Sequence, residues 1–293
     1  MNSPTSKNSS RGNSWVPSEL ELSRRLIRKK QNNKRILIST ISSILVLGTL
    51  ILLIINSPGW QTFKNTYFDF SYGFEILPFV TKGIITNIQL TIICAISISI
   101  IALLLALART SNAAALTPFR ILATIYVDVF RGVPLLLVIL LVGFGVPALG
   151  LKGITNNVLV LGTIAVILTY SAYVAEVFRS GILSIHPSQK AAARSIGLTQ
   201  IQSMRYVILP QAVRRVIPPL LNDLVALIKD TGLVSILGVT DAIRAAQIQT
   251  SKTFNYTPYI MAAILFLLIT IPLTRFTDRS LNNSLKQQHG QAN

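Results

Sequence analysis

Long runs without a charged residue constrain the fold of this chain more than any other feature. Residues 36–55 and 83–108 contain no Asp, Glu, Lys or Arg, and each is long enough to cross a bilayer of about 30 Å as a helix. Four further apolar runs follow, at residues 121–150, 158–175, 216–239 and 259–274. A soluble core that buried all of them would be out of proportion to 293 residues. The sequence therefore predicts an all-α integral membrane protein with about six transmembrane helices.

The distribution of basic residues predicts the orientation of these helices. The chain has 27 Lys and Arg against 10 Asp and Glu, and a formal net charge of +17 can also indicate nucleic-acid binding. With residues 1–35 placed inside, however, 20 basic residues fall on inside segments and 6 on outside segments. This positive-inside asymmetry is typical of membrane proteins. We therefore expect no nucleic-acid partner, a lipid bilayer as surroundings, and both termini on the cytoplasmic side of a plasma (bacterial inner) membrane.

The same runs divide the chain into segments. Residues 1–35 are polar and basic, which predicts a disordered cytoplasmic tail. The run 36–55 is too long for a cleavable signal peptide and is expected to span the membrane. Residues 56–82 are expected as an outside loop, 83–275 as the core, and 276–293 as a cytoplasmic tail.

One inside segment, residues 176–215, is too long for a simple turn and contains helical signals of its own. Ala191, Ala192 and Ala193 favour a short helix over 188–196. Gly197 follows directly and suits the positive φ of a helix C-terminus. The small side chains would let another backbone or a groove approach closely.

A second short helix is expected from Thr199 to Leu209, with Thr199 as its N-cap and apolar residues on one face. Pro210 is expected to break this helix. On composition alone, the two helices could also form an interfacial hairpin that only lies on the membrane surface.

The spacing in this segment resembles the EAA loop of ABC importer permeases. The family pattern is E-A-A, three residues, G, nine residues and I-x-L-P, and here 191–193, Gly197 and 207–210 stand at those positions. Further motifs resemble those of the polar amino acid subfamily, the histidine, glutamine and arginine permeases. They are F-R-G-V-P-L-L at 130–136, Y-V-A-E at 173–176, P-S-Q at 187–189, L-P-Q-A at 209–212, P-x-x-x-N at 218–222 and K-D-T at 229–231.

This resemblance implies a transporter subunit rather than an enzyme. The family has a five-helix core, so the helix 36–55 would be an N-terminal addition. The loop 179–210 would act as a coupling helix that docks on an ABC ATPase subunit, and ATP hydrolysis would occur in that partner chain. The residues implied in coupling are Gln189, Ala191, Ala192, Ala193, Gly197, Leu209 and Pro210.

The resemblance also implies further partners: a second permease subunit, an extracytoplasmic substrate-binding protein and a polar amino acid as substrate. The chain contains no phosphate-binding G-x-x-x-x-G-K-[ST] motif, and two histidines and one cysteine without metal-ligand spacing argue against a metal centre. We therefore expect no cofactor and no metal in this chain.

The sequence departs from the family pattern at the Glu of E-A-A, which is Ala191, and at the preceding Gly, which is Ser188. The lost Glu removes one acidic contact and suggests an asymmetric role in a heterodimer, but a homodimer stays open. A permease for another small solute and a stand-alone secondary transporter or channel are the alternatives. The second predicts an internal repeat, which the sequence lacks.

Charged and polar residues inside the apolar runs are candidates for function, because they are costly in a bilayer. Arg131 would bind the carboxylate of an amino acid and Asp128 its amine, or the two side chains would neutralise each other. Asn222 is a further candidate for the substrate pathway. Alternatively, its side chain forms a hydrogen bond between two helices. Glu176 and Arg179 are expected to brace the start of the loop. A local helix break is expected at 131–134.

Overall fold

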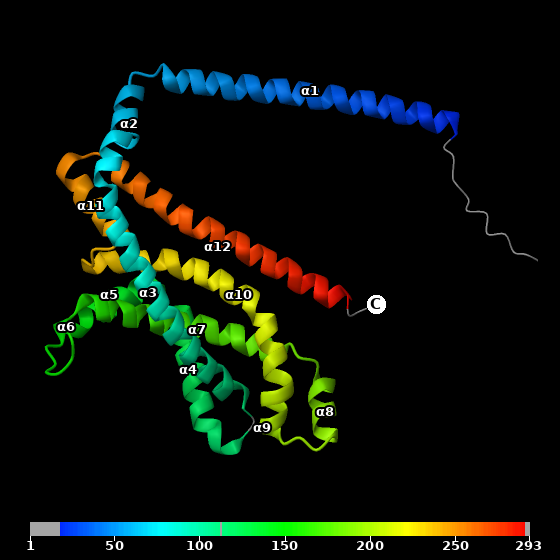
Figure 1. The fold of residues 1–293 in the computed structure, drawn as a ribbon, viewed down its shortest axis with the longest axis vertical. Coiled ribbons are helices and arrows are strands. Elements are labelled where there is room, and N and C mark those ends of the chain that lie inside the picture. Colours follow the sequence, from blue (N-terminus) through cyan, green and yellow to red (C-terminus); the bar gives the residue numbers. More distant parts are fainter. Residues whose placement is uncertain (1–17, 112, 291–293) are drawn as a thin grey trace, which may run out of the picture. The chain divides into compact units, whose positions relative to one another are not determined.

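The computed structural model describes residues 18–111 and 113–290, and helices are its only regular secondary structure there (Figure 1). In chain order the helices are α1 Glu19–Ile55, α2 Trp60–Tyr67, α3 Phe70–Thr110, η1 Ala114–Leu116, α4 Thr117–Gly132, α5 Leu135–Leu140, η2 Leu141–Gly145, α6 Val146–Ala148, α7 Val158–Leu183, α8 Pro187–Ser195, α9 Gln200–Ser203, η3 Met204–Ile208, α10 Leu209–Asp230, η4 Thr231–Leu237, α11 Ala242–Thr253 and α12 Thr257–Gly290. The chain forms two units, Met1–Thr62 and Phe63–Asn293.

Four helical stretches are long and apolar enough to cross a membrane, and a bent pair makes a fifth. They are Glu19–Ile55, Trp60–Thr110, Val158–Leu183 and Thr257–Arg279, and the pair is Ala114–Gly132 with Leu135–Ala148. The all-helical membrane class is confirmed, with four to five candidate spans among the described residues where about six were predicted. The difference lies in 216–239, because the helix α10 that covers most of it also contains Arg214 and Arg215, and with Asp223, Lys229 and Asp230 it carries too many charges for a candidate span.

Helix α1 begins earlier than predicted. Residues 19–35 were expected in a disordered tail, but they form the first half of α1. The Ser18 hydroxyl accepts from the Glu21 N–H and caps the helix, and the Glu21 carboxylate pairs with Arg25 one turn later at 2.8 Å. These local interactions support a helix that an unfavourable composition does not predict. The remaining part of the tail, residues 1–17, lies outside the described residues.

The expected outside loop 56–82 is also largely helical. It contains α2 and the beginning of α3, which starts at Phe70 and not at Gly83. The Asp69 carboxylate accepts from the Tyr72 N–H at 3.1 Å and caps α3. Lys82 marks the edge of the apolar run but lies about three turns inside α3, because a lysine has a good helix propensity and its charge limits the apolar run without ending the helix.

The core of the second unit is centred on α3 and α7, which pack along each other. A buried apolar cluster joins them to α4, α5, α10 and η4, and it includes Cys94. A second cluster joins α3 to α11 and α12. Helices α7 and α10 approach closely at Gly181, where a Cβ atom would lie 2.2 Å from Val216 Cγ1.

Helices α4 and α5 meet at a bend of 104°, which confirms the predicted helix break. Val133 is extended, with φ −102° and ψ 131°, because the following Pro134 disfavours the helical conformation at the residue before it. The bend turns the chain sharply just after Arg131.

Candidate functional site

The predicted coupling segment contains helix α8, which packs through one buried alanine and is capped by a histidine. The His186 Nδ1 accepts from the Ser188 N–H at 3.2 Å. Ala193 is buried, whereas Gln189, Ala191 and Ala192 are exposed. Helix α8 thus packs through one alanine and presents the other two, with Gln189, on its free surface.

The turn after α8 has the geometry that the sequence predicted. Gly197 has φ +87°, the left-handed conformation that glycine adopts without strain. Its N–H donates to Arg194 O, and the Leu198 N–H donates to Ala193 O. Thr199 then caps α9 in a reciprocal capping box with Gln202, which confirms it as the N-cap.

The prediction that Pro210 breaks the second helix was wrong. Helix α9 continues through the π-helical stretch η3 into α10, and Pro210 lies in the first turn of α10. A proline removes one backbone N–H and crowds the carbonyl four residues earlier. The wider π-helical stretch relieves that crowding, and the Val207 carbonyl accepts from Gln211 Nε2 at 2.9 Å. Leu209 is half-buried and Pro210 is exposed.

The coupling segment is fixed to the helices below it. Figure 1 shows α8 beside the α9–η3 stretch, at the same end of this unit as the connection from α3 to α4. Ile208 is buried in a small apolar cluster with the end of α7, and Met204 packs against this cluster. The Arg215 guanidinium also bonds to the carbonyl and the hydroxyl of Ser184.

Three large side chains of the segment are nevertheless exposed. Ile196 is 77% exposed, Ile201 80% and Tyr206 63%. Ile201 is not part of the packed cluster, but with Met204 and Leu107 it lines an open groove of about 860 Å³. The structure thus adds Ile196, Ile201 and Tyr206 to the candidate contact residues that the motif alone indicated.

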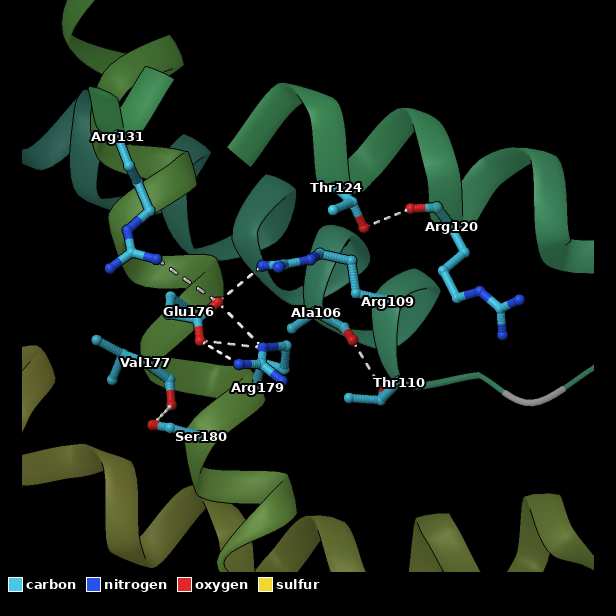
Figure 2. A network of polar contacts seen from close by, with 10 residues as sticks. All are labelled: Ala106, Arg109, Thr110, Arg120, Thr124, Arg131, Glu176, Val177, Arg179 and Ser180. Carbon is cyan, nitrogen blue, oxygen red and sulfur yellow. Dashed lines mark hydrogen bonds and ion pairs between the residues drawn. The ribbon is translucent and has the colours of Figure 1, made fainter. Parts of the chain in front are cut away.

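A cluster of charged side chains lies where α3, α4 and α7 meet (Figure 2). The Glu176 carboxylate accepts from Arg109 Nη1 at 2.8 Å and from Arg179 Nε at 3.0 Å. The side chains of Arg109 and Glu176 are only 12% and 22% exposed. The predicted Glu176–Arg179 pair is therefore present just before the coupling segment, and Arg109 ties it to α3.

Sequence reasoning missed Arg109 as the partner of Glu176. A signal was available: each is the first charged residue after a long apolar run, at 83–108 and 158–175, and both were placed on the same side of the membrane. Two such residues on helices that pack together lie at a similar depth in the membrane. Pairing across helices follows when their charges are opposite.

The structure does not pair Asp128 with Arg131, which corrects the self-neutralising alternative. The Arg131 guanidinium instead lies 3.9 Å from the Glu176 carboxylate, and the Arg131 carbonyl accepts from Tyr173 Oη at 3.2 Å. Arg131 lies in the last turn of α4, directly before the break, and its side chain reaches toward Glu176 on α7 and not back to Asp128. Both side chains are exposed in the single chain.

A mainly apolar cavity of about 290 Å³ lies between α3, α7 and α10. Asp223 lines it, and its Oδ2 is buried without a hydrogen-bond partner among the described residues. Tyr170 also lines the cavity and donates to the Asp230 carboxylate at 2.6 Å. Asn222, the predicted pathway residue, directly precedes Asp223 in the sequence. It is exposed and does not line the cavity.

Comparison with known proteins places this geometry in a family. The family model of the binding-protein-dependent transport system inner membrane component matches residues 111–281, which include the α4–α5 bend, the charge cluster except Arg109, and the coupling segment. The chain belongs to this family. The permease is 32% identical to the arginine transport system permease protein ArtQ of Bacillus subtilis (strain 168), over 74% of this chain and 97% of the relative. It is 34% identical to the putative glutamine transport system permease protein GlnP of Rickettsia conorii (strain ATCC VR-613 / Malish 7), over 69% and 92%.

Solved structures agree with the assignment. A crystal structure of an amino acid ABC transporter with histidines matches with a TM-score of 0.66 and 33% identity, over 72% of this chain and 96% of that chain. An inward-facing MetNI methionine ABC transporter shares the fold, with a TM-score of 0.56 and 17% identity over 70% of this chain and 95% of that chain. The chain is thus an inner-membrane, multi-pass permease of an ABC amino-acid import system, a transporter subunit and not an enzyme. Such a system works with ATPase and binding-protein partners.

Proposed function

We propose that this permease imports a polar amino acid and that the α8–α9 segment is its docking site for a partner ATPase. The observation that supports the docking site is a contrast within that segment. Ile196, Ile201 and Tyr206 are exposed, while the backbone beneath them is capped, packed and bonded to α7 and α10. Exposed apolar side chains on a rigid support are typical of a protein interface.

The attachment of the segment supports a mechanical role. Helix α9 runs through η3 into α10 without an intervening loop, so a displacement of α9 is passed directly to α10. The ion pairs of Glu176 join the last turns of α7 to α3. A partner that pulls on α8 and α9 would therefore move α10 and the α3–α7 pair together, and ATP binding and hydrolysis in that partner would drive the motion.

The orientation proposed for the chain follows from its charges. The coupling segment, the α3–α4 connection and the two terminal segments carry the basic residues of the inside segments, and both termini would lie in the cytoplasm. A substrate-binding protein would then deliver the amino acid at the opposite face. A second permease subunit, a copy of this chain or a related one, would complete the pathway, because five spans enclose too little space alone.

The cavity beside Asp223 is the best-supported part of a substrate pathway within this chain. An unpartnered carboxylate oxygen in an apolar cavity is costly until a cation or a hydrogen-bond donor reaches it. The ammonium or side-chain cation of an amino acid would supply that partner. Asp128 and Asn222 are exposed, so they would reach a substrate only along a surface shared with a second subunit.

Co-purification of the tagged permease from membranes, followed by identification of the bound chains by mass, tests the docking proposal. We expect an ATPase subunit, and we expect Ala192→Trp to remove it without lowering the yield of folded permease, because Ala192 is exposed. Ala193→Trp is the structural contrast, since Ala193 is buried and its replacement should disrupt folding. An Ala192→Trp permease that retains the ATPase would overturn the assignment. A permease that moves amino acid into vesicles without any ATPase would replace it by secondary transport.

A further inference from the structure

A basic hollow lies beside the charge cluster, at the end of α3 and the beginning of α4. It has a volume of about 310 Å³ and is lined by Arg109, Arg120, Ile121, Thr124, Ile125 and Arg179. Three arginines from three helices thus border one space. A hollow of this size is at the lower end of the range for ligand sites.

The positive charge around the hollow exceeds the negative charge that faces it. Glu176 is the one acidic side chain paired with these arginines among the described residues, and it is already shared by Arg109 and Arg179. Arg120 has no acidic partner in the described part of the chain, and its Nη1 donates only to the Ser111 carbonyl at 3.3 Å. Figure 2 shows the Arg120 side chain turned away from Glu176. Asp128, further along α4, pairs with none of the three in the described residues.

The other wall of the hollow is apolar and exposed. Ile121 and Ile125 lie one turn apart on α4 and are each 54% exposed. The exposed apolar face of α4 continues through Phe119 and Leu122. A free anion would gain nothing from these side chains, whereas a molecule with a charged head and hydrocarbon chains would use both walls.

We propose that this hollow binds the phosphate group of an anionic phospholipid. Arginine suits this role because its planar guanidinium offers paired N–H donors to phosphate oxygens. The phosphate would lie between Arg109, Arg120 and Arg179, and the acyl chains would follow Ile121 and Ile125. The site would exist whether or not the coupling segment docks an ATPase, so the two proposals fail independently.

Native mass spectrometry of the full-length permease in detergent tests the site. The probes are dioleoyl phosphatidylglycerol and dioleoyl phosphatidylcholine, which have the same acyl chains and differ in net charge. We expect retention of phosphatidylglycerol over phosphatidylcholine and about five-fold weaker retention in Arg120→Gln, since one basic residue near a bilayer contributes about 1 kcal/mol. Arg214→Gln on α10 is the control, because Arg214 is an exposed arginine that lies outside the hollow.

Two further measurements test whether the apolar wall contributes to lipid binding and whether the site binds a lipid phosphate or free phosphate. Ile125→Ser should weaken retention of phosphatidylglycerol while leaving the charges intact, and inorganic phosphate should not displace the lipid. Equal retention by Arg120→Gln and Arg214→Gln, equal binding of the two lipids, or displacement by inorganic phosphate would each overturn the lipid site. Thermal stability measured without added lipid checks that Arg120→Gln folds. If Arg120→Gln does not fold, Arg120→Lys takes its place, and weaker retention of phosphatidylglycerol is again expected.

Discussion

Two polar clusters in the second unit differ in how completely their groups are satisfied. In one, Asn87 on α3, Thr231 in η4 and Asp241 before α11 are all fully buried. Asn87 Nδ2 donates to Asp241 Oδ2 at 3.1 Å, and its Oδ1 accepts from the Ala242 N–H at 3.1 Å. In the other, Glu176 is shared among arginines that remain partly exposed.

The difference separates a structural cluster from one that can still bind. The Asn87–Asp241 cluster is closed, because its main donors and acceptors face each other inside the protein. The Glu176 cluster is open, because its arginines have more donors than one carboxylate can accept. A closed cluster fixes helices in place at a high cost of disruption. An open cluster keeps donors for a ligand or a partner.

The largest loss of stability is expected from breaking the closed cluster at Gly83. A Cβ atom on Gly83 would lie 2.5 Å from the backbone of Asp241 and Ala242, which cannot move aside as a side chain tip can. Gly83→Ala should therefore force α3 away from α11 and cost about 3 kcal/mol. The measurement is the thermal midpoint of the purified permease in detergent.

Gly132→Ala is the control for this change, since a Cβ atom at Gly132 meets nothing within 4 Å. It introduces the same methyl group on another helix. A Gly83→Ala permease as stable as Gly132→Ala would show that the closed cluster is not a rigid junction.

The next largest effect is expected from Glu176→Gln in the open cluster. The amide keeps the shape of the side chain but leaves Arg109 and Arg179 without a counter-charge. Removing one partner of a well-buried ion pair costs about 3–5 kcal/mol, and the partial exposure here lowers the expectation to about 2 kcal/mol. Thermal stability and ATP-driven uptake by the reconstituted transporter measure the change together. Unchanged uptake with lowered stability would refute a role of this cluster in coupling.

Within the open cluster, the effect of an arginine should follow its burial. Arg109 is 12% exposed and bonds to Glu176 at 2.8 Å, whereas Arg131 is 42% exposed and lies 3.9 Å away. Arg109→Gln should cost about 1–2 kcal/mol, and Arg131→Gln should stay within about 0.5 kcal/mol. Denaturation of the two variants side by side tests this order. The reverse order would mean that burial does not rank these arginines and that Arg131 contributes more to folding than its 3.9 Å contact indicates.

Much of the coupling segment could be predicted from the sequence because its signals are local. The positive φ of Gly197 and the capping box at Thr199 depend on residues within a few positions of each other. The effect of Pro210 was local as well, but the prediction lacked the π-helical alternative that absorbs a proline. Pattern and spacing thus predict turns and caps better than they predict whether a helix continues through a proline.

The long-range contacts could not be predicted in the same way. Asn87 and Asp241 are separated by most of the core in sequence, and no local pattern links them. The unpartnered oxygen of Asp223 depends on how α3, α7 and α10 pack, which sequence periodicity does not specify. The charge-free runs predicted the helices and their class, while the pairing of polar groups needed the three-dimensional arrangement.

The smallest expected effect is a dependence of stability on pH, which concerns the closed cluster. Burial raises the pKa of the Asp241 carboxyl above its ordinary range, although the Arg244 N–H and Asn87 donate to it. A raised pKa in the folded state means that folding favours the protonated form. The contribution of Asp241 is therefore fully present below about pH 4, near the unfolded pKa, and is lost as the pH rises through the raised value.

Asp241→Asn removes this titration, although its amide gives the donors of Asn87 and Arg244 only one acceptor oxygen. The stability of the original permease relative to Asp241→Asn should therefore decrease as the pH rises from about 4. Glu75→Gln, at a carboxyl on the exposed surface of α3, serves as the control for general charge effects. A difference between the original permease and Asp241→Asn that is constant with pH would mean that Asp241 is held in one protonation state throughout. A difference that grows with pH would mean that the hydrogen bonds outweigh burial, and the closed cluster would then be stabilised by a buried charge.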